Sequence, residues 1–160
     1  INKKTHIVVS KLPRNEDYLT NYDGYVVTTE HFDLANPVTK VDDIPDYEMY
    51  SQTIDSLNKR FGNRVLKSIE IGYIASEKDR IIDYLADKDY DLKLLSVHHN
   101  GQFDYLDDEV KDMDPAIVIP QYFAQLSEAL VVIEADVFAH FDYGFRVFGL
   151  SVAEFKQYEA

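Results

Sequence analysis

The sequence predicts an α/β protein built around a parallel sheet. Five short apolar runs recur along the chain with helical or polar segments between them, at residues 6–9, 25–29, 66–71, 92–97 and 136–141. This alternation is typical of β/α units, whose consecutive strands lie parallel. Histidine and carboxylate side chains also follow several of the runs, as expected where parallel strands end at a functional edge.

The strand signal is clearest at residues 25–29 and 92–97. The first run is rich in β-branched side chains, and residues 94–97 of the second are almost continuously apolar. Both compositions are typical of strands that other elements cover on both faces. We therefore expect these two strands to be buried on both faces.

Two of the segments between the predicted strands show features typical of helices. A helix is predicted over residues 47–61, ending at Gly62, because apolar side chains spaced four, three and four apart form one face: Tyr50, Ile54, Leu57 and Phe61. Ser76 followed by Asp79 resembles a capping box with Asp in place of Glu, and it predicts a helix over residues 78–86.

Two further helices are predicted later in the chain. The ring of Pro120 suits a first helical turn, so we expect a helix from Pro120 to residue 130. Ser151 with Glu154 is expected to cap the last helix. Residues 35–46 are predicted to form the longest plain loop, and the acidic stretch 104–114 is interpreted as a solvated helix face.

Length and composition indicate a folded domain. A chain of 160 residues is long enough for one domain with a core, and 46% hydrophobic with 28% charged residues excludes a disordered composition. The sequence begins with Ile1 rather than Met and stops just after its last predicted helix begins. We therefore expect residues 1–160 to form a single domain that is incomplete at both ends.

The charge balance narrows the classes of partner. Sixteen Lys and Arg against 29 Asp and Glu give a net charge of −13, which repels nucleic acid and anionic lipid and attracts cations. Without cysteine, any metal must be held by His, Asp or Glu. The sequence shows no apolar run of about 18 residues and no basic-then-apolar leader. We expect a cytoplasmic protein without nucleic-acid or membrane partners.

Four ligand-type residues stand near the ends of four predicted strands. They are His31, Glu70, His98 and His140. Because the carboxyl ends of parallel strands meet at one edge, these side chains are expected to converge although they are distant in sequence. A site rich in histidine with a carboxylate suits zinc, manganese or iron.

Each of these residues also has a plainer interpretation. A single histidine at a strand end is more often a hydrogen-bonded structural residue than a ligand, and Glu70 alone fits an exposed residue paired with Lys. Their recurrence in successive units favours a shared site. His98 and His99 are adjacent, and successive strand side chains point to opposite faces. We favour His98 as the residue that faces the site, and a direct role for His99 stays open.

Two carboxylates flank one of the candidate ligands. Glu30 and Asp33 lie on either side of His31, so they either orient its imidazole or are solvated loop residues. Asp142, two residues beyond His140, has the same two interpretations.

Arg146 follows in a Gly-Phe-Arg loop. It is either a phosphate contact, since a guanidinium binds oxyanions through two parallel hydrogen bonds, or an ordinary surface charge.

Four short motifs carry a family resemblance. They are Thr-Glu-His-Phe-Asp at 29–33, Ile-Glu-Ile-Gly-Tyr at 69–73, Leu-Ser-Val-His-His at 95–99 and Ala-His-Phe-Asp at 139–142. Their order resembles the polymerase and histidinol phosphatase (PHP) superfamily, most closely its histidinol-phosphatase branch. The resemblance spans residues 18 to about 155, and each motif alone is short.

This resemblance implies a distorted (β/α)7 TIM-like barrel, of which about five β/α units are present. It implies up to three divalent ions, Zn, Mn or Fe, at the carboxyl end of the barrel. It also implies hydrolysis of a phosphomonoester, typically L-histidinol phosphate in histidine biosynthesis, by water that a metal activates. By motif, the ligands would be His31, Glu70, His98 and His140, and we expect His98, Glu70 and Arg146 to act in catalysis.

The chain departs from the family pattern at two places. Family members begin with a His-x-His strand, whereas Lys4-Thr5-His6 offers only His6 as a ligand, and a charged Lys has no lone pair for a metal. Family members also carry a late Asp-x-His motif, and the given sequence stops before any such segment, so fewer than three ions are expected.

These departures leave two other functions open. The first is a truncated or degenerate, non-catalytic PHP remnant that dimerises or binds a partner through an open sheet edge, and a homodimer would cover that edge. The second is an unrelated metal-dependent hydrolase.

Overall fold

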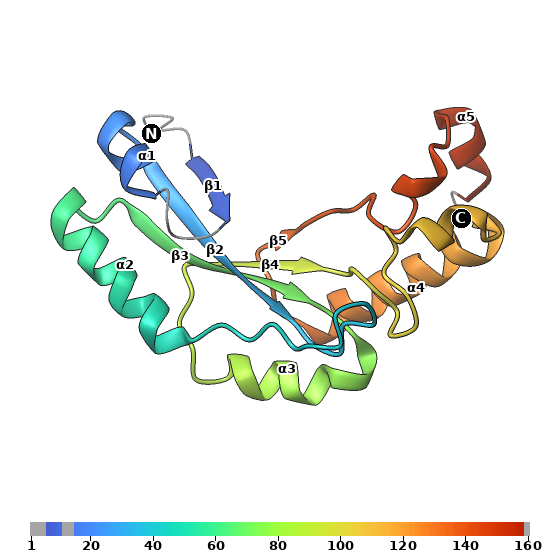
Figure 1. The fold of residues 1–160 in the computed structure, drawn as a ribbon, viewed down its shortest axis with the longest axis horizontal. Helices are drawn as coiled ribbons and strands as arrows, with labels where there is room; N and C mark the ends of the chain where they lie inside the picture. The colour runs from blue at the N-terminus through green and yellow to red at the C-terminus, as the bar shows by residue number, and fades with distance from the viewer. Residues whose placement is uncertain (1–5, 11–14, 159–160) are drawn as a thin grey trace.

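The fold is an α/β structure with a five-stranded, wholly parallel sheet. The computed structural model describes residues 6–10 and 15–158, and their side chains from Glu16 onward. The strands pair in chain order (Figure 1): β1 (His6–Ser10), β2 (Tyr25–Asp33), β3 (Val65–Gly72), β4 (Leu92–Ser96) and β5 (Val137–Phe138). The predicted α/β class with a parallel sheet is confirmed. Within the described residues β1 and β5 are the two edges, and closure into a barrel is not shown.

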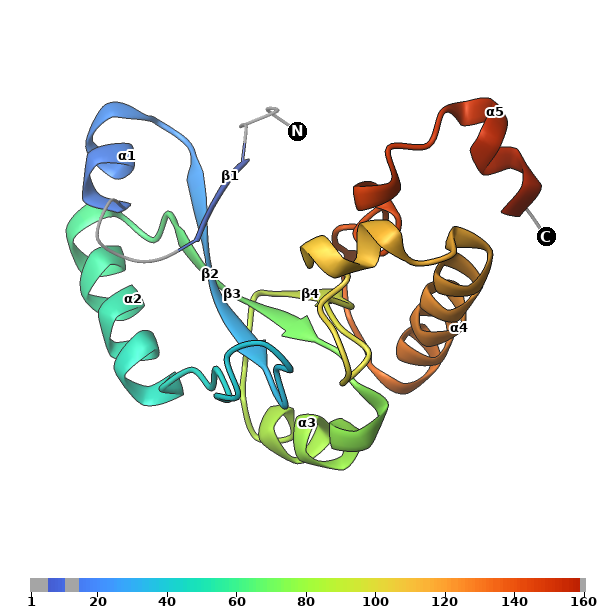
Figure 2. The ribbon, with the colours of Figure 1, turned by 45° about the vertical axis from the view of Figure 1, so that its right-hand side comes forward.

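In the described part of the chain, four helices connect successive strands, and a fifth, α5, follows the last strand. They are α1 (Asn15–Asn21), α2 (Tyr47–Phe61), α3 (Lys78–Leu85), α4 (Pro115–Val132) and α5 (Val152–Phe155). Figures 1 and 2 show α2, α3 and α4 following one another around the outside of the sheet. Short 3-10 turns complete the connections: η2 (Ala75–Glu77), η3 (Asp108–Asp112), η4 (Arg146–Phe148) and η5 (Lys156–Tyr158).

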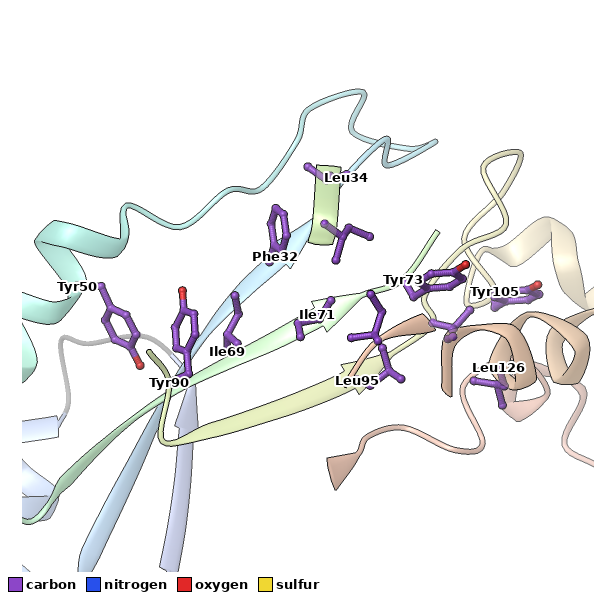
Figure 3. Close-up of a cluster of buried hydrophobic side chains, with 14 of the residues drawn as sticks. Phe32, Leu34, Tyr50, Ile69, Ile71, Tyr73, Tyr90, Leu95, Tyr105 and Leu126 are labelled. Carbon is purple, nitrogen blue, oxygen red and sulfur yellow. The ribbon is translucent and has the colours of Figure 1, made fainter. Parts of the chain in front are cut away.

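The core lies between the sheet and these helices. Ile69, Ile71 and Leu95 are completely buried in the central strands. Figure 3 shows them among aromatic side chains from the helices and loops, including Tyr50 and Tyr105. β2 is buried from Val26 to Thr29, but Leu92 and Leu94 of β4 remain partly exposed, so β4 is less covered than the sequence predicts.

The alternation of side chains along β2 divides its residues between two environments. Phe32 packs on Tyr84 of α3, with ring centroids 4.3 Å apart, and the Thr28 hydroxyl lies 2.7 Å from the Tyr50 hydroxyl of α2. Thr29, His31 and Asp33 therefore point to the opposite face. The register places His31 beside Glu70 and Asp33 beside Gly72.

The helix over residues 47–61 is confirmed. Asp46 caps it by accepting a hydrogen bond from the Met49 amide, and Gly62 ends it with a left-handed φ of 76°. Ser151 and Glu154 form the predicted capping box of α5. In contrast, the capping box predicted at Ser76 is wrong, because a 3-10 turn precedes α3 and no side chain caps that helix.

The predicted start of α4 is also wrong. The helix begins at Pro115, five residues before Pro120, because the Asp114 side chain accepts a hydrogen bond from the Ala116 amide and Pro115 occupies the first turn. Pro120 lies inside the helix, where it has no N–H to donate to the Ala116 carbonyl.

Two other predicted segments differ in detail. The strand predicted at 136–141 is reduced to β5, since His140 has a left-handed φ of 52° that extended backbone does not adopt. In the acidic stretch 104–114, η3 exposes Asp108 and Glu109 but buries Val110 completely, so this segment is not simply a solvated helix face.

By length and composition alone, α4 could cross a membrane. Core helices of soluble proteins meet the same criteria, and α4 buries Val118, Tyr122 and Leu126 within the protein.

Candidate metal centre

Glu70 is the centre of a cluster of imidazole rings. Its Oε1 atom lies 3.2 Å from Nε2 of His98 and 3.0 Å from Nε2 of His140, and its Oε2 lies 3.7 Å from Nδ1 of His31. His31 comes from β2 and Glu70 from β3, while His98 and His140 follow β4 and β5. The structure thus brings together the four side chains that the sequence places near four strand ends.

Three of these side chains are close enough to share one cation. Ligand atoms of Glu70, His98 and His140 all lie within 4.8 Å of one another. Two imidazole nitrogens and a carboxylate oxygen form a donor set that suits zinc, manganese or iron. The residues present therefore fit a divalent metal.

The charges of the cluster keep Glu70 ionised. Burial raises the pKa of Glu70, but the hydrogen bond from His98 and the charges of His98, His140 and His31 outweigh burial and lower it. A carboxylate that stays ionised in a buried position is suited to holding a cation.

His98 is charged in the metal-free protein. Burial lowers the pKa of His98, but hydrogen bonds to Asp33 and Glu70 outweigh burial and raise it to about 10. At neutral pH the ring therefore carries a proton at each nitrogen, and a metal must displace the proton that faces Glu70.

The backbone of His6 lies at the opposite end of the strands from His31. The register of β1 pairs His6 with Tyr25, and His31 lies six positions further along β2, roughly 20 Å away at about 3.3 Å per residue. The His6 side chain and Lys4 lie outside the described residues, so the expectation that His6 is a ligand stays a prediction.

His99 lies away from the cluster, in the loop that follows β4. It is 2% exposed, its Nδ1 accepts a 3.2 Å hydrogen bond from the Gly101 amide, and its carbonyl accepts one from Gln125. Burial lowers the pKa of His99, which favours the neutral ring. These contacts give His99 the structural role of holding its loop.

The flanking carboxylates differ in what they contact. Asp33 lies beside His98, with Oδ1 2.8 Å from Nδ1, rather than beside its sequence neighbour His31. Glu30 lies on the helix side of β2, and its charge contributes to the raised pKa of Tyr50.

Asp142 and Arg146 form a two-bond ion pair with each other. The two hydrogen bonds are 2.9 and 2.7 Å long, and both side chains are about half exposed. The hydrogen bond from Arg146 lowers the pKa of Asp142. In this structure Asp142 thus pairs with the guanidinium, and Arg146 already holds a carboxylate.

Several residues that sequence analysis did not select support the cluster. The Tyr143 ring lies 4.9 Å from that of His98, and its hydroxyl donates to Asp104. Tyr122 donates a 3.0 Å hydrogen bond to the His140 carbonyl and packs where a side chain at Gly144 would overlap its ring. The sequence offered no signal for these tyrosines. It did offer one for Gly72, because a glycine within a strand often marks a place where another group comes close to the backbone.

Together, the parallel sheet and the histidine–carboxylate cluster define an α/β protein with a candidate metal site at the carboxyl ends of its strands. No family model and no curated protein matches the sequence.

Among solved structures, a similar fold is found in histidinol phosphate phosphatase (HisK) from Lactococcus lactis subsp. lactis Il1403, complexed with zinc, L-histidinol and phosphate. The TM-score is 0.76 at 20% identity, and the match covers 89% of this chain. The chain spans 60% of the length of that phosphatase. At this identity the likeness shows a histidinol-phosphatase-like fold.

Proposed function

We propose that this chain belongs to a divalent-metal-dependent phosphomonoester hydrolase of the histidinol-phosphatase kind, which converts L-histidinol phosphate and water to L-histidinol and phosphate in histidine biosynthesis. The observation that carries the proposal is the convergence of three imidazoles on the buried Glu70 carboxylate. Support comes from the similar fold of a phosphatase solved with zinc, L-histidinol and phosphate.

Glu70, His98 and His140 would hold the metal. His31 lies next to this group, with its Nδ1 3.7 Å from Oε2 of Glu70. A divalent ion of this class lowers the pKa of a bound water to about 7 and offsets the negative charge of a phosphoryl group. The residues supply two neutral nitrogens and one carboxylate, so a bound divalent ion leaves the centre with net positive charge towards an anionic substrate. We propose Zn, Mn or Fe as the ion.

Arg146 is proposed as the phosphate contact. It lies six residues after His140, and its guanidinium already makes two parallel hydrogen bonds to the Asp142 carboxylate. A phosphate presents the same pair of oxygens. If a phosphate group replaced the Asp142 carboxylate on the Arg146 guanidinium, the substrate would lie beside the loop that carries His140.

The proposal extends to the whole protein. We place the five parallel strands in one PHP-like domain with a (β/α)7 barrel, and we propose a cytoplasmic protein without nucleic-acid or membrane partners. A homodimer would cover the sheet edge formed by the short β5. The structural match to 60% of the phosphatase chain supports the proposed fold alone.

Phosphate release from histidinol phosphate, measured with added manganese or zinc, tests the proposal. We expect turnover in the wild type, and a loss of more than about 100-fold in kcat/KM in His98→Ala and Glu70→Gln, because each removes a metal donor. Glu109→Gln is the matched control, since Glu109 is exposed on η3, and it should leave turnover unchanged.

Absence of both turnover and bound metal in the purified wild type would contradict the proposal and favour the non-catalytic remnant. Metal binding with hydrolysis of other substrates alone would favour a different metal-dependent hydrolase.

A further inference from the structure

Asp33 contacts a site residue from a distant part of the chain. Its Oδ1 lies 2.8 Å from Nδ1 of His98, while Nε2 of the same ring lies 3.2 Å from Glu70. The side chains of Asp33 and His98 are 14% and 12% exposed, so water competes little for this contact. An imidazole that is held at both nitrogens has a fixed orientation.

The main chain of Asp33 is held as well. Asp33 is the last residue of β2, its amide donates a 3.0 Å hydrogen bond to the Asp43 carbonyl, and its carbonyl accepts one of 2.7 Å from the Asp43 amide. This bridge ties the loop after β2 back to the strand end. The carboxylate therefore projects towards His98 from a fixed backbone.

Gly72 provides the space that Asp33 occupies. It lies beside Asp33 in the β2–β3 register, and a Cβ atom at Gly72 would lie 1.8 Å from Asp33 Oδ1 and 2.8 Å from its Cγ. Gly72 is not among the residues with positive φ, so its backbone is open to any residue. What the position requires is the absence of a side chain.

We propose that Asp33 is the positioning residue for His98: it accepts the Nδ1 hydrogen, fixes the ring tautomer and aims Nε2 at Glu70, and Gly72 is the neighbour that makes this contact possible. Its consequence for metal binding rests on the proposed function. Carboxylates that orient a histidine ligand in this way typically change metal affinity by 10- to 100-fold.

Cobalt(II) binding to the full chain, followed by its visible absorption, tests the assignment. We expect Asp33→Ala to weaken binding about 10- to 100-fold. Asp33→Asn should fall in between, because its amide oxygen still accepts a hydrogen bond without the charge. Gly72→Ala should weaken binding by a similar factor by displacing Asp33. The double variant, Asp33→Ala with Gly72→Ala, should bind cobalt as Asp33→Ala does, because the methyl group at position 72 then has no Asp33 carboxylate to displace.

Asp43→Ala is the matched control. It makes the same charge change next to Asp33, the Asp43 side chain is exposed, and the main-chain bridge is retained. Its affinity should stay within about twofold of the wild type. An equal loss in Asp43→Ala, or a full extra loss from Gly72→Ala in the double variant, would overturn the assignment.

A metal-free measurement separates this inference from the proposed function. The imidazole 15N spectrum of His98 should change at Nδ1 in Asp33→Ala and remain unchanged in Asp43→Ala. An unchanged Nδ1 signal in Asp33→Ala overturns the role of Asp33, whereas a wild type that binds no cobalt contradicts the metal centre and leaves the 15N result to decide on Asp33.

Discussion

At Glu70 and His98, burial and charge pairing act on the pKa in opposite directions, and charge pairing outweighs burial. Burial acts against the charge on both Glu70 and His98, yet their mutual contact, with Asp33 behind His98, keeps both groups ionised. Such a buried arrangement is costly to break on one side only, because the remaining charge loses its partner.

The stability of the metal-free protein should therefore depend on the charge of His98. Its pKa rises from 6.5 to about 10 on folding, so the folded state binds the proton more tightly. This stabilisation is complete below about pH 6.5 and is lost as the pH rises through 10, by about 5 kcal/mol in all. Urea unfolding of chelated protein between pH 6 and pH 10 measures it. In His98→Gln the slope over this range should be much smaller, and an identical slope would contradict the assignment.

Gly144 should be essential for the loop that carries His140. A Cβ atom there would lie 2.1 Å from Cγ of Tyr122, so we expect Gly144→Ala to destabilise the protein by about 1–3 kcal/mol and to loosen His140. Gly62→Ala is the comparison, because φ is positive but no atom lies within 4 Å, and only about 1 kcal/mol of backbone strain is expected. Denaturant unfolding of both variants compares the two losses of stability. A larger loss in Gly144→Ala would show that overlap with Tyr122 costs more than backbone strain at a positive φ.

At the level of helices and strands, pattern alone predicted much of the fold. The central strands and α2 follow from runs and periodicity that are local in the sequence. The start of α4 does not, because two prolines compete for the first turn and only the structure shows that Asp114 caps the helix. β5 is shorter than its apolar run suggests, since the backbone at His140 turns to support the site.

The two prolines of α4 should respond oppositely to substitution. Pro120 is exposed inside the helix, so Pro120→Ala restores a backbone donor and should stabilise the protein by about 1–2 kcal/mol after allowance for the freer unfolded chain. Pro115 occupies the first turn, where no donor is missing, so Pro115→Ala should be neutral or slightly destabilising. Thermal unfolding compares them, and equal effects would show that position in the helix does not matter.

For the molecule as a whole, the site depends on several β/α units at once. The sequence predicted the convergence of His31, Glu70, His98 and His140, because parallel strands share one carboxyl end. It did not predict that the Asp33 carboxylate contacts the His98 ring, or that Gly72 leaves the space for the Asp33 side chain. Both features depend on contacts between residues that are distant in sequence.

Metal should stabilise the entire sheet. A ligand that binds only the folded state at 100 times its Kd adds about 2.7 kcal/mol, so zinc or manganese should raise Tm by several degrees. Glu70→Gln should abolish this rise, while Glu109→Gln should retain it. Differential scanning calorimetry with and without a chelator measures the effect, and an equal rise in both variants would indicate binding elsewhere.

The order of the strands has a consequence for biosynthesis. Because each strand pairs with the one before it, the sheet can grow from the amino terminus while the ribosome is still translating. The last donor, His140, is translated only after all five described strands. A nascent chain that stalls before His140 could form most of the sheet, but it would lack one of the three proposed metal ligands.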